Sequence, residues 1–333
     1  MENKYKSLLL VCLIMAIFSS CKKEDNPIKY KNGIFSDSVT VCLDAINSPY
    51  DDYNSDLFLL EGKDILVFSS NRNSGGGNFD IIQANLSYSF NQTTAAFWVE
   101  SGSSSDDLTS RILNKANTPN DDLGPNRFFC GKDGYEYFIL STETDGAGLD
   151  LFYLRNLPEG SEYTSEIFGP APVTRINTSS ANEGYFSFNL QKDTAYFCSD
   201  KDGRFDIYMT PCDEKKDLSR WLSSPYSDPI KVDILSSIYN DKCPYVYNDI
   251  IVFASDRPGG IGGYDLYYSY YKDGAWTAPI NFGPEINTEY DEYRPVIGYN
   301  YQYSNLYMIF SSNRPGGKGG FDLYFRGLTP SYK

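Results

Sequence analysis

Residues 309–324 read IFSSNRPGGKGGFDLY, and residues 252–267 read VFASDRPGGIGGYDLY. Three less regular copies follow the same plan at residues 67–81, 138–151 and 196–207. A phrase that returns after several tens of residues is typical of a fold in which each repeat is one supersecondary unit stacked on its neighbours. The sequence therefore predicts a repeat architecture.

A second short phrase precedes each copy and sets the spacing of the units. It begins at Ile46, Ala116, Ile176, Leu235 and Ile286, so the intervals are 70, 60, 59 and 51 residues by subtraction. Each unit has room for about four short strands rich in Tyr, Phe, Val and Ile, separated by Gly, Asn, Asp and Pro. That is the size of one β-propeller blade.

The two ends of the repeat region indicate how the ring closes. Only residues 329–333 follow the third strand of the last unit, which leaves no room for a fourth strand. Residues 38–43 lie before the first unit, at the place of a fourth strand, and we expect them to complete the last blade and cover its free edge. Five copies predict one all-β propeller of five four-stranded blades. A sixth blade would need a copy hidden in the oversized first unit, near residues 97–99.

The repeat resembles the WD40-like repeat of TolB-type propellers, as in lipoproteins of Bacteroidetes. The phrase S-[DN]-R-P-G-G-x-G-G-[YF]-D-L-Y carries most of the likeness, which extends over residues 46–328. The resemblance implies a propeller domain over residues 34–333. It implies little about activity, because propellers host many unrelated functions.

The N-terminal segment predicts export and lipid anchoring. Residues 1–20 join a basic start to a short apolar stretch, as in a signal peptide. Residues 18–21 resemble a lipobox, which makes Cys21 the predicted lipidation site; an ordinary secretory signal is the alternative. Residues 21–33 then form a linker, in which residues 22–25 resemble the export tag of surface lipoproteins. We therefore expect a protein attached to the outer membrane by lipid alone and exposed at the cell surface.

Composition excludes several classes of function. The chain carries 29 Lys and Arg against 44 Asp and Glu, a net charge of −15. Removal of residues 1–20 takes away Glu2, Lys4 and Lys6, a net +1, and leaves −16. This charge argues against nucleic acid or an anionic lipid surface as a partner. The chain has no histidine, which excludes Ser-His-Asp and Cys-His catalysis and histidine metal ligands.

The cysteines of the mature chain show no metal-binding spacing. Apart from Cys21 they are Cys42, Cys130, Cys198, Cys212 and Cys243. Their odd number does not fit a fully paired disulfide framework. We expect free thiols packed as small apolar side chains.

Carboxylates remain as candidate chemistry. In a propeller, the loops that lead into the first strand share a face with the turns between the second and third strands. The acidic pairs at residues 51–52, 121–122 and 291–292 should meet on this face, and a carboxylate pair can hydrolyse a glycoside. Recurrence in blade after blade instead favours a structural role, because a catalytic site is unique. We expect the recurring residues to link neighbouring blades by hydrogen bonds; they are Asp256, Arg257, Asp265, Glu292, Asn313, Arg314 and Asp322.

Residues 199–206 place several side-chain oxygens close together in the sequence. Such a stretch could hold Ca²⁺, but it lacks the full twelve-residue loop pattern, and we expect a tight turn and no cofactor. Tyrosine is densest at residues 267–271 and 299–303. Exposed rings there could bind a sugar or a protein partner, whereas buried rings would pack between blades.

These observations together predict a non-enzymatic binding module at the cell surface. Its ligand would be another envelope protein or an extracellular glycan, bound at the loop face or in the central channel. The alternative is a carboxylate-based enzyme that acts on glycans, either a glycosidase or a lyase.

Overall fold

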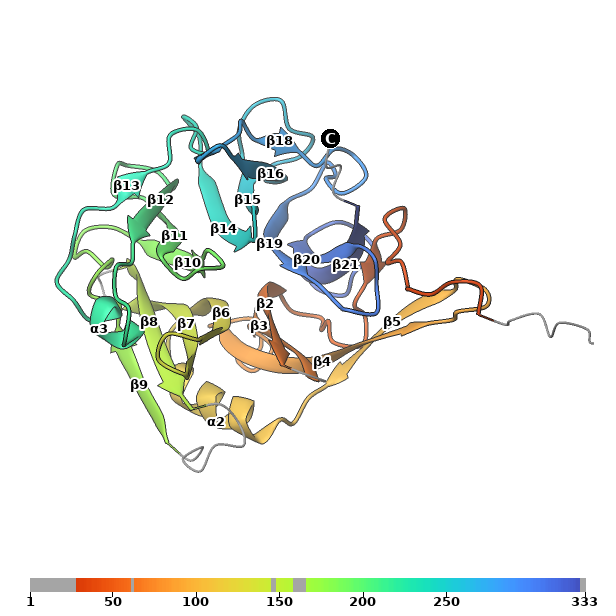
Figure 1. Cartoon of the computed structure of the whole chain (residues 1–333), viewed down its shortest axis with the longest axis horizontal. Helices are drawn as coiled ribbons and strands as arrows, with labels where there is room; N and C mark the ends of the chain where they lie inside the picture. The colour runs from red at the N-terminus through yellow and green to blue at the C-terminus, as the bar shows by residue number, and fades with distance from the viewer. Residues whose placement is uncertain (1–27, 61–62, 145–147, 158–165, 330–333) are drawn as a thin grey trace, which may run out of the picture.

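A computed structural model describes residues 28–60, 63–144, 148–157 and 166–329. They form a ring of five antiparallel sheets, so the prediction of a five-bladed propeller is confirmed. Figure 1 shows the blades around one axis, with the first strand of each blade nearest the centre. The predicted signal peptide, residues 1–20, and Cys21 lie outside the described residues.

The first three blades each contain four strands in sequence order. The first blade consists of β2 (Asp52–Leu60), β3 (Lys63–Ser70), β4 (Asp80–Phe90) and β5 (Phe97–Ser103). The second consists of β6 (Asp122–Cys130), β7 (Tyr135–Thr144), β8 (Gly148–Asn156) and β9 (Ile167–Pro172). The third consists of β10 (Glu183–Phe188), β11 (Thr194–Ser199), β12 (Asp206–Pro211) and β13 (Ile230–Lys231). Residues 97–99 belong to β5, the fourth strand of the first blade, which excludes a sixth blade there.

The fourth blade splits its outer strand into two short pieces. It consists of β14 (Asp241–Tyr247), β15 (Ile250–Ser255), β16 (Asp265–Lys272), β17 (Ala275–Trp276) and β18 (Ile280–Asn281). Both β17 and β18 pair with β16. The fifth blade consists of β19 (Glu292–Gly298), β20 (Leu306–Ser312), β21 (Asp322–Leu328) and β1 (Val41–Cys42).

The N-terminal segment closes the ring as predicted. Strand β1 pairs antiparallel with β21, with Val41 opposite Phe325. The preceding residues bind the same blade, because Gly327 N donates to Ser36 O at 2.8 Å. Phe35 is fully buried and stacks on Tyr303 with ring centroids 3.9 Å apart. The closing segment therefore contributes to the core as well as to the sheet edge.

Every first strand carries a β-bulge at the same place. The register shifts between Tyr53 and Asp56 in β2, and at the equivalent position in β6, β10, β14 and β19. Each bulge contains one residue with a positive φ between 44° and 58°: Asn54, Gly124, Tyr185, Cys243 and Arg294. Four of the five are not glycine, although side chains rarely adopt this region. Bulges bend and twist a strand, which suits the crowded inner edge of each blade.

Apolar clusters fill the space between adjacent blades. One joins Tyr137 and Ile139 of the second blade to Phe186 and Phe197 of the third. Helix α2 (Asp107–Ala116) packs Leu108, Ile112 and Leu113 into the cluster between the first two blades. A shorter helix, α3 (Leu218–Leu222), contributes to the second-to-third cluster.

Two further findings concern thiols and membrane spans. The cysteines of the described residues are free thiols, and all except Cys42 are buried, as the composition predicted. No helix in the described part of the chain is long and apolar enough to cross a membrane.

Candidate functional site

A buried carboxylate begins the first strand of every blade. The five residues are Asp52, Asp122, Glu183, Asp241 and Glu292, each at most 1% exposed. Each carboxylate accepts a hydrogen bond from a backbone N–H in the loop before it, at 2.5–3.1 Å. In four blades it also accepts one from a hydroxyl near the end of the second strand, at 2.6–3.0 Å. These groups hold the loop and are not open to a substrate.

An arginine pairs with this carboxylate in three blades. Nη2 of Arg72, Arg257 and Arg314 donates to the carboxylate at 2.5, 2.5 and 2.9 Å respectively. The same nitrogen also donates to a backbone carbonyl of the preceding loop at 2.6–2.7 Å. The predicted signature residues Arg257, Arg314 and Glu292 therefore fasten a blade to the loop that leads into it.

The remaining signature residues are engaged on the same face. Asp265 accepts hydrogen bonds from Ile261 N and Gly262 N at 2.6 and 2.9 Å, and Asp322 accepts one from Lys318 N at 2.8 Å. These bonds fold the glycine-rich turns.

Two signature positions bind the start of their own blade. Asp256 accepts a hydrogen bond from Asn240 N at 2.6 Å, and Asn313 Oδ1 accepts one from Asp291 N at 2.8 Å. The link to the neighbouring blade passes through Asp291, whose Oδ1 accepts from Tyr264 N of the fourth blade at 2.8 Å.

The second and third blades lack the arginine. Thr144 and Lys201 stand two residues after the strand hydroxyl, where Arg72 stands in the first blade. The Lys201 ammonium contacts Asp228 at 3.2 Å instead of Glu183. Burial raises the pKa of Asp122 to about 6 and that of Glu183 to about 7. Both carboxylates are enclosed, so this property bears on stability and not on binding a glycan.

Two buried charged residues, Asp56 on β2 and Arg294 on β19, belong to the first strands, which lie nearest the centre of the ring. Asp56 accepts hydrogen bonds from Arg127 N at 2.7 Å and Asn126 Nδ2 at 3.3 Å. Burial raises the pKa of Asp56 to about 6, against the opposing effect of the Arg294 charge. Arg294 is fully buried and donates to Pro125 O at 2.9 Å. Both side chains are shielded from solvent, so neither is open to a ligand in the central channel considered from the sequence.

The stretch considered for calcium is occupied by contacts within the protein. Tyr208 donates its hydroxyl to Asp202 at 2.7 Å, and Lys231 pairs with Asp206 at 2.5 Å. The described residues contain no group of three His, Cys, Asp or Glu side chains that could hold a metal.

An open groove of about 820 Å³ lies between the third and fourth blades. Trp276, Tyr271 and Tyr196 form its aromatic wall. Trp276 Nε1 donates to the Tyr196 hydroxyl at 3.2 Å, and the Tyr271 ring meets Trp276 edge to face at 5.1 Å. Tyr271 is 46% exposed, so the wall presents apolar ring surface to solvent.

Three exposed carboxylates line the same groove. Asp193 lies in the turn between β10 and β11, Asp213 follows β12, and Asp249 lies in the turn between β14 and β15. Backbone bonds position them, since Cys212 N donates to Asp193 O and Tyr271 N to Asp249 O, both at 2.7 Å.

The three carboxylates differ in their partners. Asp193 Oδ1 accepts hydrogen bonds from Asn189 Nδ2 at 2.6 Å and Thr194 Oγ1 at 3.1 Å. Within the described ranges, no protein donor contacts the carboxylates of Asp213 and Asp249. The groove therefore offers one oriented and two unengaged carboxylates beside an aromatic wall.

Tyrosine side chains of strand β16 line two separate cavities, the groove described above and a smaller pocket on the opposite face of the strand. Side chains alternate along a strand, so Tyr267 and Tyr271 face the third blade while Tyr268 and Tyr270 face the fifth. The run at residues 267–271 was the sequence signal for these surfaces. The sequence did not identify Asp193, Asp213 and Asp249 as site residues, because each stands alone in a different connection between strands.

Comparison with known proteins identifies only the fold. No family model matches the chain, and no curated protein matches it either. Among solved structures, a thermostable family-43 glycoside hydrolase is similar with a TM-score of 0.51 at 12% identity, over 92% of this chain and 97% of that one. The catalytic domain of a GH62 α-L-arabinofuranosidase from Coprinopsis cinerea gives 0.52 at 11%, over 90% and 98%. An exo-1,5-α-L-arabinanase from a bovine ruminal metagenomic library gives 0.50 at 10%, over 86% and 95%.

These similarities correct two expectations. The resemblance to TolB-type repeats is wrong, because the similar solved structures given above are named as glycoside hydrolases or arabinan-active enzymes and not as TolB-type repeat proteins. The glycine-rich phrase that suggested it serves the turns of each blade, as the contacts of Asp265 and Asp322 show. The expectation of a non-enzymatic binding module is also wrong, since the similar structures are named as enzymes, and the glycosidase alternative fits them better.

Proposed function

We propose that the chain is a carboxylate-dependent glycoside hydrolase that binds its glycan in the groove between the third and fourth blades. The observation that carries the proposal is the meeting of Trp276 and Tyr271 with three exposed aspartates in one groove. The shared fold with glycoside hydrolases supports the reaction class, and the groove provides a place for it.

The groove has the physical features that sugar recognition requires. Its volume of about 820 Å³ lies within the usual range for ligand sites, ~300–1,000 Å³. The C–H face of a sugar ring can pack on the exposed rings of Tyr271 and Trp276, which supply apolar area at a small entropic cost. Sugar hydroxyls can donate to the carboxylates of Asp213 and Asp249.

The chemistry follows from the groups that are present. With no histidine in the chain, carboxyl groups are the natural proton donors and acceptors in this groove. In a glycosidase one carboxylic acid protonates the leaving oxygen, while a second carboxylate activates water or attacks the anomeric carbon. Asp193, oriented by Asn189 and Thr194, suits the second role. Asp249, from the opposite blade, suits the first.

The names of the similar structures suggest where to begin with substrates. Two of them are an α-L-arabinofuranosidase and an exo-1,5-α-L-arabinanase. We propose arabinose-containing glycans as the first class to examine. A lyase is the second form of the same hypothesis and would leave unsaturated sugar ends.

The cellular location of the protein is also a proposal. We propose that lipidation of Cys21 anchors the enzyme to the outer membrane, where extracellular glycans are within reach. Replacement of Cys21 by Ser should release the protein from isolated membranes. Persistence in the membrane fraction would rule out this anchor.

The catalytic proposal is tested with purified protein, a panel of aryl glycosides and arabinan. We expect hydrolysis of at least one substrate, and a loss of more than about 100-fold in kcat in Asp193→Asn and Asp249→Asn, in line with the usual contribution of acid–base groups. Asp107→Asn is a matched control, because Asp107 is 91% exposed on α2, outside the groove. Activity in Asp193→Asn and Asp249→Asn equal to that of the natural chain would contradict the assignment of the site.

A further inference from the structure

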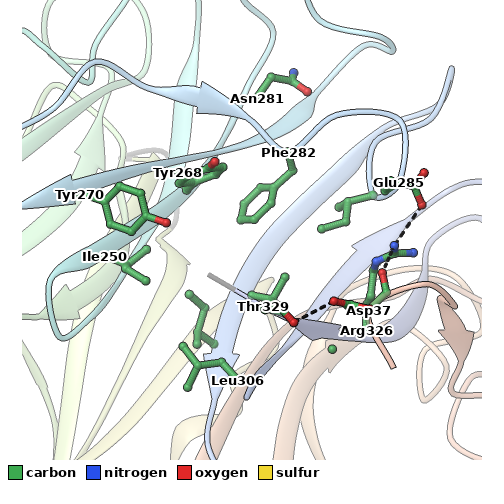
Figure 2. A pocket seen from close by; sticks show the side chains of 14 residues that line it. Asp37, Ile250, Tyr268, Tyr270, Asn281, Phe282, Glu285, Leu306, Arg326 and Thr329 are labelled. Atoms are coloured by element: carbon green, nitrogen blue, oxygen red, sulfur yellow. Dashed lines mark hydrogen bonds and ion pairs between the residues drawn. The ribbon is translucent and has the colours of Figure 1, made fainter. Parts of the chain in front are cut away.

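A second, smaller pocket lies between the fourth and fifth blades and has a volume of about 230 Å³ (Figure 2). Figure 2 shows the aromatic rings on one side of this pocket and a polar group on the other. The rings are those of Tyr268, Tyr270 and Phe282, and the polar group consists of Asp37, Glu285, Arg326 and Thr329.

The aromatic side offers an apolar surface made of rings inclined to one another. The rings of Tyr268 and Phe282 lie 4.7 Å apart, and Tyr268 meets Tyr270 edge to face at 5.5 Å. Ile250, Ile297 and other aliphatic side chains complete the lining beside them. Such a surface favours a ligand with an apolar face of ring size.

The polar side offers mainly hydrogen-bond acceptors. Arg326 is 4% exposed, and its guanidinium is already bound to Asp37 O, to Thr40 Oγ1 at 3.1 Å and to Glu285 Oε2 at 3.2 Å. Glu285 is 76% exposed at its side chain, and its second oxygen has no protein donor among the described residues. Asp37 uses Oδ2 to accept from Thr329 at 2.8 Å, which leaves Oδ1 available within the same part of the chain.

We infer that this pocket binds one neutral sugar residue. A sugar ring presents an apolar C–H face, which packs on Tyr268 and Phe282, and hydroxyl donors, which reach Glu285 and Asp37. The volume equals that of roughly eight water molecules at ~30 Å³ each, which leaves room for one sugar ring. Since this pocket lies on the other side of β16 from the catalytic groove, the inference does not depend on the proposed hydrolysis.

Occupancy of the pocket is coupled to ring closure. Asp37 and Thr40 belong to the N-terminal closing segment, whereas Arg326 and Thr329 lie in and after the last strand, β21. The pocket is complete only when these two ends of the propeller are joined. A ligand that binds only the closed ring stabilises closure by mass action.

The test measures the melting temperature of the full protein with L-arabinose, D-galactose, D-glucose and D-xylose, and with butylammonium chloride as a charged probe. At tenfold above its Kd, a bound sugar should raise Tm by roughly 3 °C. The same sugar should slow hydrogen exchange in residues 38–43. The inference would be overturned if none of the four sugars raised Tm, or if butylammonium raised it and the sugars did not.

Variants locate the effect. Phe282→Ala should abolish the shift, and Asp107→Asn, on α2 outside both the pocket and the groove, should retain it. Because Phe282 also packs against neighbouring apolar residues, Glu285→Gln and Glu285→Ala provide exposed alternatives. Glu285→Ala should weaken sugar binding several-fold, and Glu285→Gln, which keeps an acceptor oxygen, should weaken it less. Retention of the full shift in Phe282→Ala and Glu285→Ala would refute the site.

Discussion

Restoring the missing arginine of the third blade should stabilise the protein in a pH-dependent way. In the first blade, Arg72 Nε donates to Ser70 Oγ at 2.9 Å and its Nη2 reaches Asp52 at 2.5 Å. Lys201 N donates to Ser199 Oγ at 3.2 Å, and Arg72 N makes the same bond to Ser70 at 3.3 Å. The backbone is thus already placed for an arginine, and Lys201→Arg should bind Glu183.

The magnitude follows from the pKa of Glu183. The folded protein raises it from 4.5 to about 7, because the carboxyl is buried without a cation. A folded-state pKa above the unfolded value means that stability is lost as the pH rises from about 4.5 through 7. The full loss is about 3 kcal/mol at 1.36 kcal/mol per unit of pKa. Lys201→Arg should recover about 1–3 kcal/mol at pH 8, reduced by loss of the exposed Asp228 contact, worth ~0–1 kcal/mol.

Urea unfolding at pH 8 and pH 5 checks this prediction. At pH 5 Glu183 is mostly protonated in the folded state, so the arginine should add little there. Lys201→Gln serves as the control, because it removes the lysine without supplying the fork of donors, and it should not stabilise the protein at pH 8. A Lys201→Arg variant that is no more stable at pH 8, or gains equally at both pH values, would refute the reasoning.

Three further outcomes are expected. Trp276→Ala should lower kcat/KM for a cleaved glycan about tenfold or more, from the loss of ring stacking worth roughly 1–3 kcal/mol in apolar burial; unchanged kinetics would remove the aromatic wall from the site. Asp56→Asn should reduce the loss of stability that the natural chain shows as the pH rises from about 4 through 6, because burial raises the pKa of Asp56 to about 6 and its charged form is therefore disfavoured in the folded protein; a chemical denaturation midpoint that falls over this pH range as much as in the natural chain would contradict the reasoning. Deletion of residues 34–46 should unfold or oligomerise the protein, since it removes β1 and Phe35 from the last blade; an unaltered melting temperature and a monomeric elution volume would argue against closure by this segment.

Much of the fold can be predicted from the sequence, because the repeat encodes it directly. The glycine-rich turns, the β-rich runs and the incomplete last unit together specify five blades and closure by residues 38–43. The bulges could not be foreseen, since four of their positive-φ residues are types that seldom adopt that region, Tyr185 and Arg294 among them. Their recurrence at the same place in all five first strands points to the shared blade geometry and not to local preference.

The candidate site was harder to predict than the fold. The recurring acidic loops contained the candidate catalytic residues in the sequence. In the structure, carboxylates such as Asp52 and Glu292 accept hydrogen bonds from backbone N–H groups and arginine side chains, so they are not available to a substrate. Asp193, Asp213 and Asp249 stand alone in three separate segments, and only the packing of one blade on the next brings them to one groove. The tyrosine run at residues 267–271 indicated aromatic surfaces on this strand. Which of its side chains line the groove and which line the smaller pocket depends on the blade that each face of β16 contacts.

The most direct measurement is the release of reducing sugar from arabinan and aryl glycosides by the purified protein, compared with Asp249→Asn and Asp107→Asn. Hydrolysis is expected in the natural chain and in Asp107→Asn, with loss of turnover in Asp249→Asn at unchanged melting temperature. No turnover of any glycan by the folded natural chain would contradict the assignment as a glycoside hydrolase.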